Sequence, residues 1–184
     1  DLREIAMQTV QQLGRLLEKN IYFYFGKPEI SHIPEVYKKN DNAPSMLEES
    51  EIGVAQWTYR NNRRAGFSTE TLPGSRCMFL AVRSAESVFA VVGIDMEGEE
   101  IPSFEAGIME AILNECAFAL EKENLLAQQK ETDLRLQKEQ LRANLLRSIS
   151  HDLRTPLTSI SGNAENLLMN EETMSEEQRK KVYR

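Results

Sequence analysis

The chain has 184 residues, with 22 basic and 29 acidic side chains, a net charge of −7 and a hydrophobic fraction of 41%. This length allows one substantial core with a smaller additional element, and excludes a large multidomain enzyme. The acidic balance argues against binding to nucleic acid or anionic lipid, so we expect no nucleic-acid partner. The two cysteines predict neither a disulfide framework nor a zinc site. No apolar run approaches the roughly 20 residues of a membrane span.

The N-terminal part predicts a small α+β domain with one antiparallel sheet. An amphipathic helix is indicated by apolar residues at three- and four-residue steps, namely Ile5, Ala6, Val10, Leu13, Leu16 and Leu17. A second helix is expected over 48–62. Runs rich in β-branched and aromatic residues predict strands at 21–25, 77–82 and 88–96, the last two paired antiparallel. The Pro-containing segment 26–44 predicts irregular structure or an edge strand, and 68–76 predicts a loop.

The rest of the chain predicts one very long helix. Pro102 and Ser103 form a start signal, and neither proline nor glycine interrupts the sequence from Ile108 to Thr155. Heptad spacing with several polar defects indicates a coiled coil, and a second copy of the chain is the expected partner. The alternative is a solvated charged linker around 128–140.

One face of this helix carries candidate chemistry. At roughly 100° per residue, apolar positions cluster opposite His151, so its ring is predicted to face solvent. Thr155 falls within roughly 40° of His151. The Asp152 carboxylate is expected to accept from the ring Nδ1 and to raise the nucleophilicity of Nε2. Pro156 leaves the Asp152 carbonyl without its helical donor, so a bend is expected just beyond the histidine.

The residues 148–157, Ser-Ile-Ser-His-Asp-Leu-Arg-Thr-Pro-Leu, with Ile160, Gly162 and Ala164, resemble the H-box of sensor histidine kinases. The segments 140–147 and 55–74 are similar, more narrowly, to the potassium-responsive branch of that family. This resemblance implies a GAF-like sensory domain at 1–125, a connecting helix or coiled coil at 104–147, and an incomplete dimerisation and phosphoacceptor domain (HisKA) at 148–184. It also implies the cytoplasmic portion of a membrane sensor protein that acts as a homodimer.

The same resemblance implies roles for three residues. His151 would accept the γ-phosphoryl group of ATP and pass it to an aspartate of a response regulator. Asp152 would assist as an acid or base, and Thr155 would serve dephosphorylation of the regulator. No Gly-rich phosphate loop is present in the sequence. We therefore expect no cofactor or metal site in this chain, ATP and Mg²⁺ on a nucleotide-binding domain of the intact kinase, and no activity of the chain alone.

The two ends predict a portion of a longer protein. The sequence starts at Asp1 within a helical pattern and stops at Arg184, shortly after a helix-start signal. That signal is a capping box formed by Ser175 and Gln178, which follows a predicted inter-helix loop at 169–173. The second helix of the phosphoacceptor hairpin is therefore expected to be incomplete.

A small ligand of the GAF-like domain is expected, but its chemistry stays open. Residues 1–128 carry 12 basic and 20 acidic side chains, a net charge of −8 that disfavours anions. Four arginines, Arg60, Arg63, Arg64 and Arg76, are interpreted either as an anion site or, preferably, as a solvated turn. Trp57 and Tyr59 either line a cavity or pack the core. Cys77 is not expected to be reactive, and His32 is expected at the surface. The alternative function is a ligand-sensing module that acts only as a dimerising relay.

Overall fold

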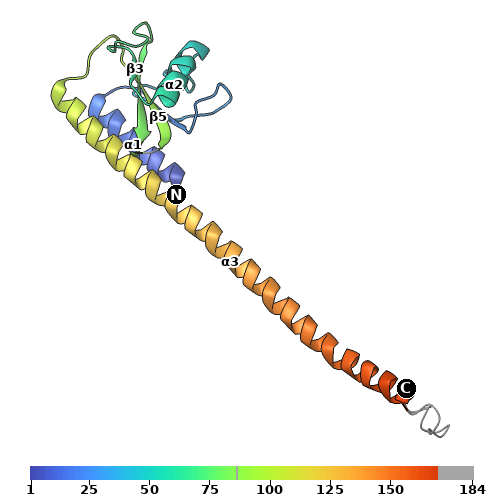
Figure 1. Ribbon diagram of the computed structural model, residues 1–184. Coiled ribbons are helices and arrows are strands. Elements are labelled where there is room, and N and C mark those ends of the chain that lie inside the picture. Colours follow the sequence, from blue (N-terminus) through green and yellow to red (C-terminus); the bar gives the residue numbers. More distant parts are fainter. Residues whose placement is uncertain (86, 170–184) are drawn as a thin grey trace. The chain divides into compact units, whose positions relative to one another are not determined.

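The computed structural model describes residues 1–85 and 87–169 (Figure 1). The elements follow the order α1 (Leu2–Leu17), β1 (Ile21–Phe25), β2 (Glu35–Tyr37), α2 (Glu49–Asn61), β3 (Ala65–Gly66), β4 (Cys77–Arg83), β5 (Val88–Asp95) and α3 (Ser103–Met169). They form two units, one of residues 1–128 and one that begins at Gln129. The helix predicted from Ser175 lies outside the described residues.

The first unit contains a five-stranded sheet with the order β2-β1-β5-β4-β3. All four strand pairs are antiparallel, so the predicted α+β class with one antiparallel sheet is confirmed. The segment 26–44 contributes β2 as one edge strand. The other edge is β3, which the sequence analysis missed. It pairs with β4 only at Phe79 and Met78.

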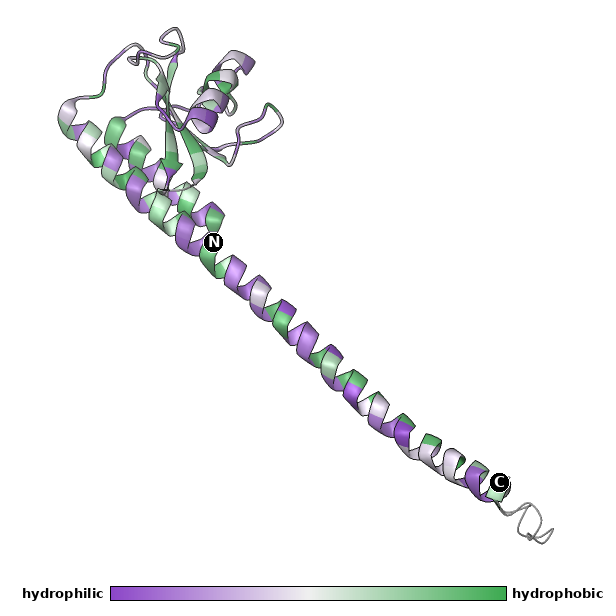
Figure 2. Cartoon of the chain, in the orientation of Figure 1, coloured by the Kyte–Doolittle hydropathy of each residue, from purple (hydrophilic) through white to green (hydrophobic). Residues whose placement is uncertain are grey.

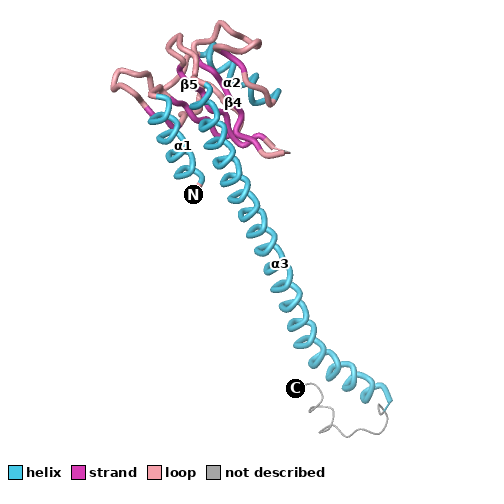
Figure 3. The backbone as a smooth tube through the Cα atoms, turned by 90° about the vertical axis from the view of Figure 1, so that its left-hand side faces the viewer, coloured by secondary structure: helices cyan, strands magenta, loops and turns pink. Residues whose placement is uncertain are grey.

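The two faces of the sheet bury separate apolar clusters, because side chains alternate between faces along each strand. Phe23 and Val92 pack with α1 and the first turns of α3, whereas Tyr24 and Phe79 pack with α2. Figure 3 shows α1 and the start of α3 on one side of the sheet and α2 on the other. Burial of each of these aromatic side chains contributes on the order of 2 kcal/mol to the free energy of unfolding. Packing on the two faces of the sheet is therefore a main source of stability in this unit.

Helix α2 ends where the chain must turn back into the sheet. Asn62 adopts a left-handed conformation with φ 53°, and its N–H donates to the carbonyl oxygen of Thr58. This C-cap is one of the standard ways to end a helix, and asparagine tolerates it better than most residues. Residues 63 and 64 then lead into the short strand β3, which pairs with β4.

Helix α3 has 67 residues and continues through Pro156 to Met169. In the first unit it packs on the sheet through five buried residues, Met109, Leu113, Cys116, Ala117 and Leu120. From Gln129 onward its described side chains are almost all exposed, and hydrophilic and hydrophobic residues alternate along it (Figure 2). Within the described residues, no helix is both long and apolar enough to cross a membrane.

Candidate functional site

His151 and Asp152 lie side by side on α3. Their side chains are 80% and 75% exposed, and 3.5 Å separates Nδ1 of His151 from Oδ1 of Asp152. This distance is at the long end of the hydrogen-bonding range. With the proton on Nδ1, the ring donates to the carboxylate and leaves the Nε2 lone pair directed to solvent.

Thr155 lies one helical turn beyond His151 on the same face, since residues four apart are neighbours on a helix surface. Its side chain is exposed. Pro156, which lacks an N–H, cannot donate to the carbonyl of Asp152. Just beyond, the Thr158 hydroxyl donates to the carbonyl oxygen of Arg154 at 2.8 Å. This bond is made to a different carbonyl from the one that Pro156 leaves without its helical donor.

The opposite face of this part of α3 is apolar and exposed. We call it the apolar stripe; it consists of Leu145, Ile149, Leu153, Leu157 and Ile160, each between 53% and 64% exposed. A stripe of this length on a surface helix is normally covered by another helix. No described residue covers it.

The site can therefore present a nucleophilic nitrogen to a large partner. Nucleophilic catalysis by histidine needs an accessible nitrogen and a group that fixes the tautomer. The His151 ring is exposed, and the Asp152 carboxylate lies 3.5 Å from its Nδ1. Among the described residues, no group of three or more His, Cys, Asp and Glu side chains is arranged to hold a metal ion.

The other candidate site residues of the first unit lie in surroundings typical of residues with a structural role. Cys77 is fully buried, and burial, followed by the nearby charges of Glu51 and Asp95, raises the pKa of its thiol, which keeps the sulfur protonated. His32 is half exposed, with its Nε2 3.8 Å from the Glu29 carboxylate. Tyr59 is partly buried and packs against the cluster beneath α2.

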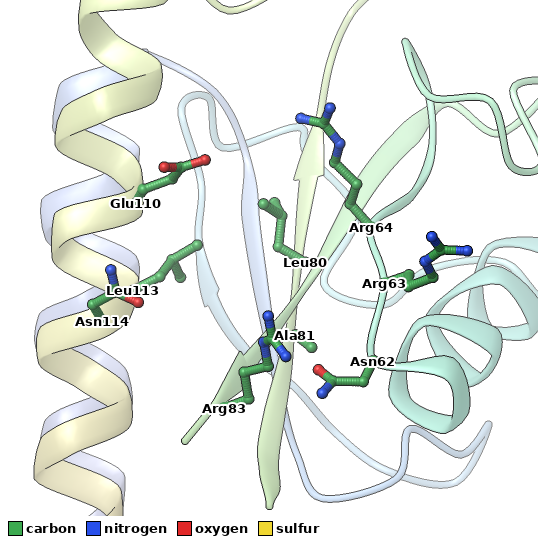
Figure 4. A pocket seen from close by; sticks show the side chains of 9 residues that line it. All are labelled: Asn62, Arg63, Arg64, Leu80, Ala81, Arg83, Glu110, Leu113 and Asn114. Atoms are coloured by element: carbon green, nitrogen blue, oxygen red, sulfur yellow. The ribbon is translucent and has the colours of Figure 1, made fainter. Parts of the chain in front are cut away.

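The four arginines grouped in the sequence do not form a single site in the structure. Arg76 pairs with Asp95, with 3.3 Å between Nε and Oδ2, and Arg60 is exposed on α2. Arg63 and Arg64 line a cavity of about 450 Å³, which we call the arginine pocket (Figure 4). Its lining residues are Asn62, Arg63, Arg64, Leu80, Ala81, Arg83, Glu110, Leu113 and Asn114.

Sequence reasoning missed Arg83 as a pocket residue. The strand pairing of β4 and β5 has an irregularity between Val82 and Arg83, and such bulges redirect a side chain. The residue lies near the end of a predicted strand, where a charged side chain carries no signal that separates a binding role from simple solvation.

Comparison with known proteins places the histidine in a characterised class of domain. Residues 141–184 match the family model of the His Kinase A (phospho-acceptor) domain. The first unit has a fold similar to that of a solved protein, the native GAF domain of the potassium sensor histidine kinase KdpD from Escherichia coli. The TM-score is 0.53 and the identity 22%, over 69% of this chain and 86% of that one. The chain thus combines a unit with a GAF-like fold and a segment that matches the HisKA model, which confirms the predicted resemblance.

The sequence is similar to two proteins named Sensor protein KdpD. The chain is 28% identical to the protein of that name from Clostridium acetobutylicum over 182 residues, which is 97% of this chain and 20% of the relative. It is 34% identical to Sensor protein KdpD of Escherichia coli strain K12 over 119 residues, 63% of this chain and 13% of the relative. The chain thus spans a fifth or less of the length of these two relatives.

Proposed function

We propose that this chain is the signalling segment of a KdpD-like sensor histidine kinase, in which His151 is the phosphoacceptor. The observation that supports the proposal most directly is the exposed His151 ring with the Asp152 carboxylate 3.5 Å from Nδ1. Both residues lie within the segment that matches the HisKA family model.

The first transfer is a displacement at phosphorus. The Nε2 lone pair of His151 attacks the γ-phosphorus of ATP, an N–P bond forms, and the bond from that phosphorus to the bridging oxygen breaks, so ADP leaves with the electron pair. The Nδ1 proton stays on the ring and is directed at Asp152, whose charge stabilises the cationic character that the ring gains.

In the second transfer an aspartate carboxylate of a response regulator, of the KdpE type in this proposal, attacks the same phosphorus. The N–P bond breaks, and the imidazole regains its lone pair. Thr155, one turn from His151, is proposed to contact the water that later hydrolyses the regulator acyl phosphate.

The proposal requires partners. The apolar stripe, exposed on the helix that carries His151, supports a homodimer in which two copies of α3 cover each other's stripes. ATP and Mg²⁺ are substrates held by a separate nucleotide-binding domain. We further propose that the segment works on the cytoplasmic side of a potassium-responsive membrane sensor.

The experiment mixes the purified chain with a separately expressed nucleotide-binding domain of a KdpD kinase, Mg²⁺ and ATP radiolabelled at the γ-position. We expect a phosphoryl label that survives base and is lost in acid, as a phosphoramidate is. The matched pair of variants is His151→Gln and His32→Gln, because the chain contains two histidines. The first should lose the label, and the second should keep it.

A label that persists in His151→Gln would contradict the assignment. Absence of label from the wild-type chain, with a ligand that raises its melting temperature, would favour the alternative function, a ligand-sensing relay without phosphotransfer.

A further inference from the structure

We propose that the arginine pocket binds the phosphoryl group of a small phosphorylated metabolite. The pocket lies in the first unit, between the segment that follows α2, the end of β4 and the first turns of α3. It does not include His151, so the inference is independent of the proposed phosphotransfer.

The charge of the pocket favours an anion. The lining includes Arg63, Arg64 and Arg83 and one carboxylate, that of Glu110, a net charge of +2 (three positive, one negative). None of the three guanidinium groups forms an ion pair or hydrogen bond with another described residue. This local excess contrasts with the net charge of −8 counted over residues 1–128. Guanidinium groups suit phosphate because their fork donates two parallel hydrogen bonds.

The geometry selects two of the arginines. Figure 4 shows Arg64 and Arg83 projecting into the space across from Glu110 and Asn114 of α3, whereas the Arg63 guanidinium is directed to the other side of its segment. Arg63 and Arg64 also line an adjacent cavity of about 480 Å³ with Thr69 and Thr71. We therefore assign the phosphoryl contacts to Arg64 and Arg83, and a supporting positive potential to Arg63.

Unsatisfied polar groups point to the same place. The Asn62 Oδ1 atom is buried and has no hydrogen-bond partner among the described residues. The outer edge of β4 from Leu80 onward has no described strand beside it, because β3 pairs only with Phe79 and Met78. Buried acceptors and open strand edges are costly unless a partner supplies donors. A ligand whose hydroxyl group donates to Asn62 Oδ1 would satisfy that acceptor.

The size and floor of the pocket suit an organic phosphate. A volume of about 450 Å³ falls in the range of small-molecule sites, and Leu80, Ala81 and Leu113 provide an apolar surface. The ligand inferred is a phosphate monoester with a hydroxylated body. Free inorganic phosphate shares the charged group but lacks the body.

The test uses the full 184-residue chain, labelled with ¹⁵N and titrated at constant ionic strength. The probes are ribose 5-phosphate, inorganic phosphate, and ribose as the neutral control. We expect saturable amide shifts over 62–64 and 80–83 with both phosphates, tighter binding of the ester, and no shifts with ribose. Equal binding of ribose, or saturable shifts confined to other residues, would overturn the inference, as would no saturation with either phosphate.

Four variants sharpen the test. Arg64→Ala and Arg83→Ala should each weaken the binding of inorganic phosphate about tenfold or more, because each removes charge-assisted hydrogen bonds. Arg60→Ala removes the same charge from the neighbouring exposed position and should leave the dissociation constant unchanged. Glu110→Gln should tighten phosphate about threefold by removing a like charge. Equal losses in the Arg60 and Arg64 variants, or weaker phosphate binding by Glu110→Gln, would contradict the site.

Discussion

Glu51 of α2 accepts a hydrogen bond from the backbone N–H of Cys77, with 3.1 Å between Oε2 and the nitrogen at the start of β4. The same carboxylate accepts from the Arg76 N–H at 2.9 Å and from the Ser75 hydroxyl at 2.7 Å. Burial would raise the pKa of Glu51, but these three donors outweigh it and lower the pKa below its usual range. One ionised carboxylate thus holds the loop before β4 against α2.

Replacement of Glu51 by Gln should lower the free energy of unfolding at pH 7 by about 1–3 kcal/mol, because an ionised acceptor is lost. The folded-state pKa is depressed, so the stabilisation is present above the unfolded pKa of about 4.3 and is lost as pH falls through the folded value. Urea unfolding at pH 7 and at pH 3 measures both effects. Glu49→Gln, exposed on the same helix, is the control. An unchanged acid dependence in Glu51→Gln would refute this role.

Gly14 should behave opposite to an ordinary helical glycine. A Cβ atom at this position would overlap the ring of Tyr37 in β2, whereas nothing lies near a Cβ at Gly53 of α2. Gly14→Ala should therefore destabilise the protein by about 1–3 kcal/mol through overpacking. Gly53→Ala should stabilise it by up to about 1 kcal/mol through helix propensity. Thermal unfolding of both variants measures these changes. A Gly14→Ala variant as stable as the wild type, or more stable, would show that the Tyr37 ring moves aside freely.

A charge placed on the apolar stripe should disrupt self-association. Ile149→Glu puts a carboxylate where the proposed dimer buries an isoleucine, and we expect a monomer at micromolar concentrations by sedimentation equilibrium. Thr158→Glu introduces the same group on the His151 face and should remain dimeric. If both variants associate like the wild type, the stripe is not the dimer surface.

Asp152→Asn should slow phosphoryl transfer to His151 about 10–100-fold, because an amide can neither stabilise the charged ring nor fix its tautomer as the carboxylate does. The initial rate of label incorporation, measured with saturating nucleotide-binding domain, tests this. Circular dichroism should be unchanged, since both side chains are exposed. A wild-type rate would exclude Asp152 as an assisting group.

Thr155→Ala should separate the two directions of signalling. The variant retains His151 and Asp152, so we expect label incorporation within about twofold of the wild type, because no group of the forward transfer is removed. Dephosphorylation of the labelled regulator should slow about tenfold or more if the hydroxyl positions water. Thr158→Ala, also exposed on this face, serves as the control. Unaltered dephosphorylation in Thr155→Ala would remove this residue from the proposal.

The elements that the sequence predicted are those with strong periodicity or long β-rich runs. Helix α1, strand β1, the β4–β5 pair and the continuous α3 all follow from local pattern. Strand β3 was missed because two residues, Ala65 and Gly66, carry no alternation to detect. The contact between Gly14 and Tyr37 joins residues of different elements, so no local sequence pattern predicts it.

The candidate phosphoacceptor face was predictable for a similar reason: one helix carries His151, Asp152 and Thr155, and helical geometry fixes their neighbours. The arginine pocket was not predictable in this way. Arg76 was grouped with Arg63 and Arg64 because the three are close in sequence, but in the structure Arg76 forms an ion pair with Asp95. Arg83 and Glu110 enter the pocket from other elements, which only the packing of α3 on the sheet brings near.

The burial of both native thiols makes α3 open to chemical mapping. Cys77 and Cys116 are 0% and 4% exposed, and burial raises the pKa of each. A cysteine introduced at an exposed heptad position, such as Leu141, would therefore react far faster than either native thiol. Oxidative cross-linking across a series of such positions would report the register and orientation of paired chains, without prior removal of a native cysteine.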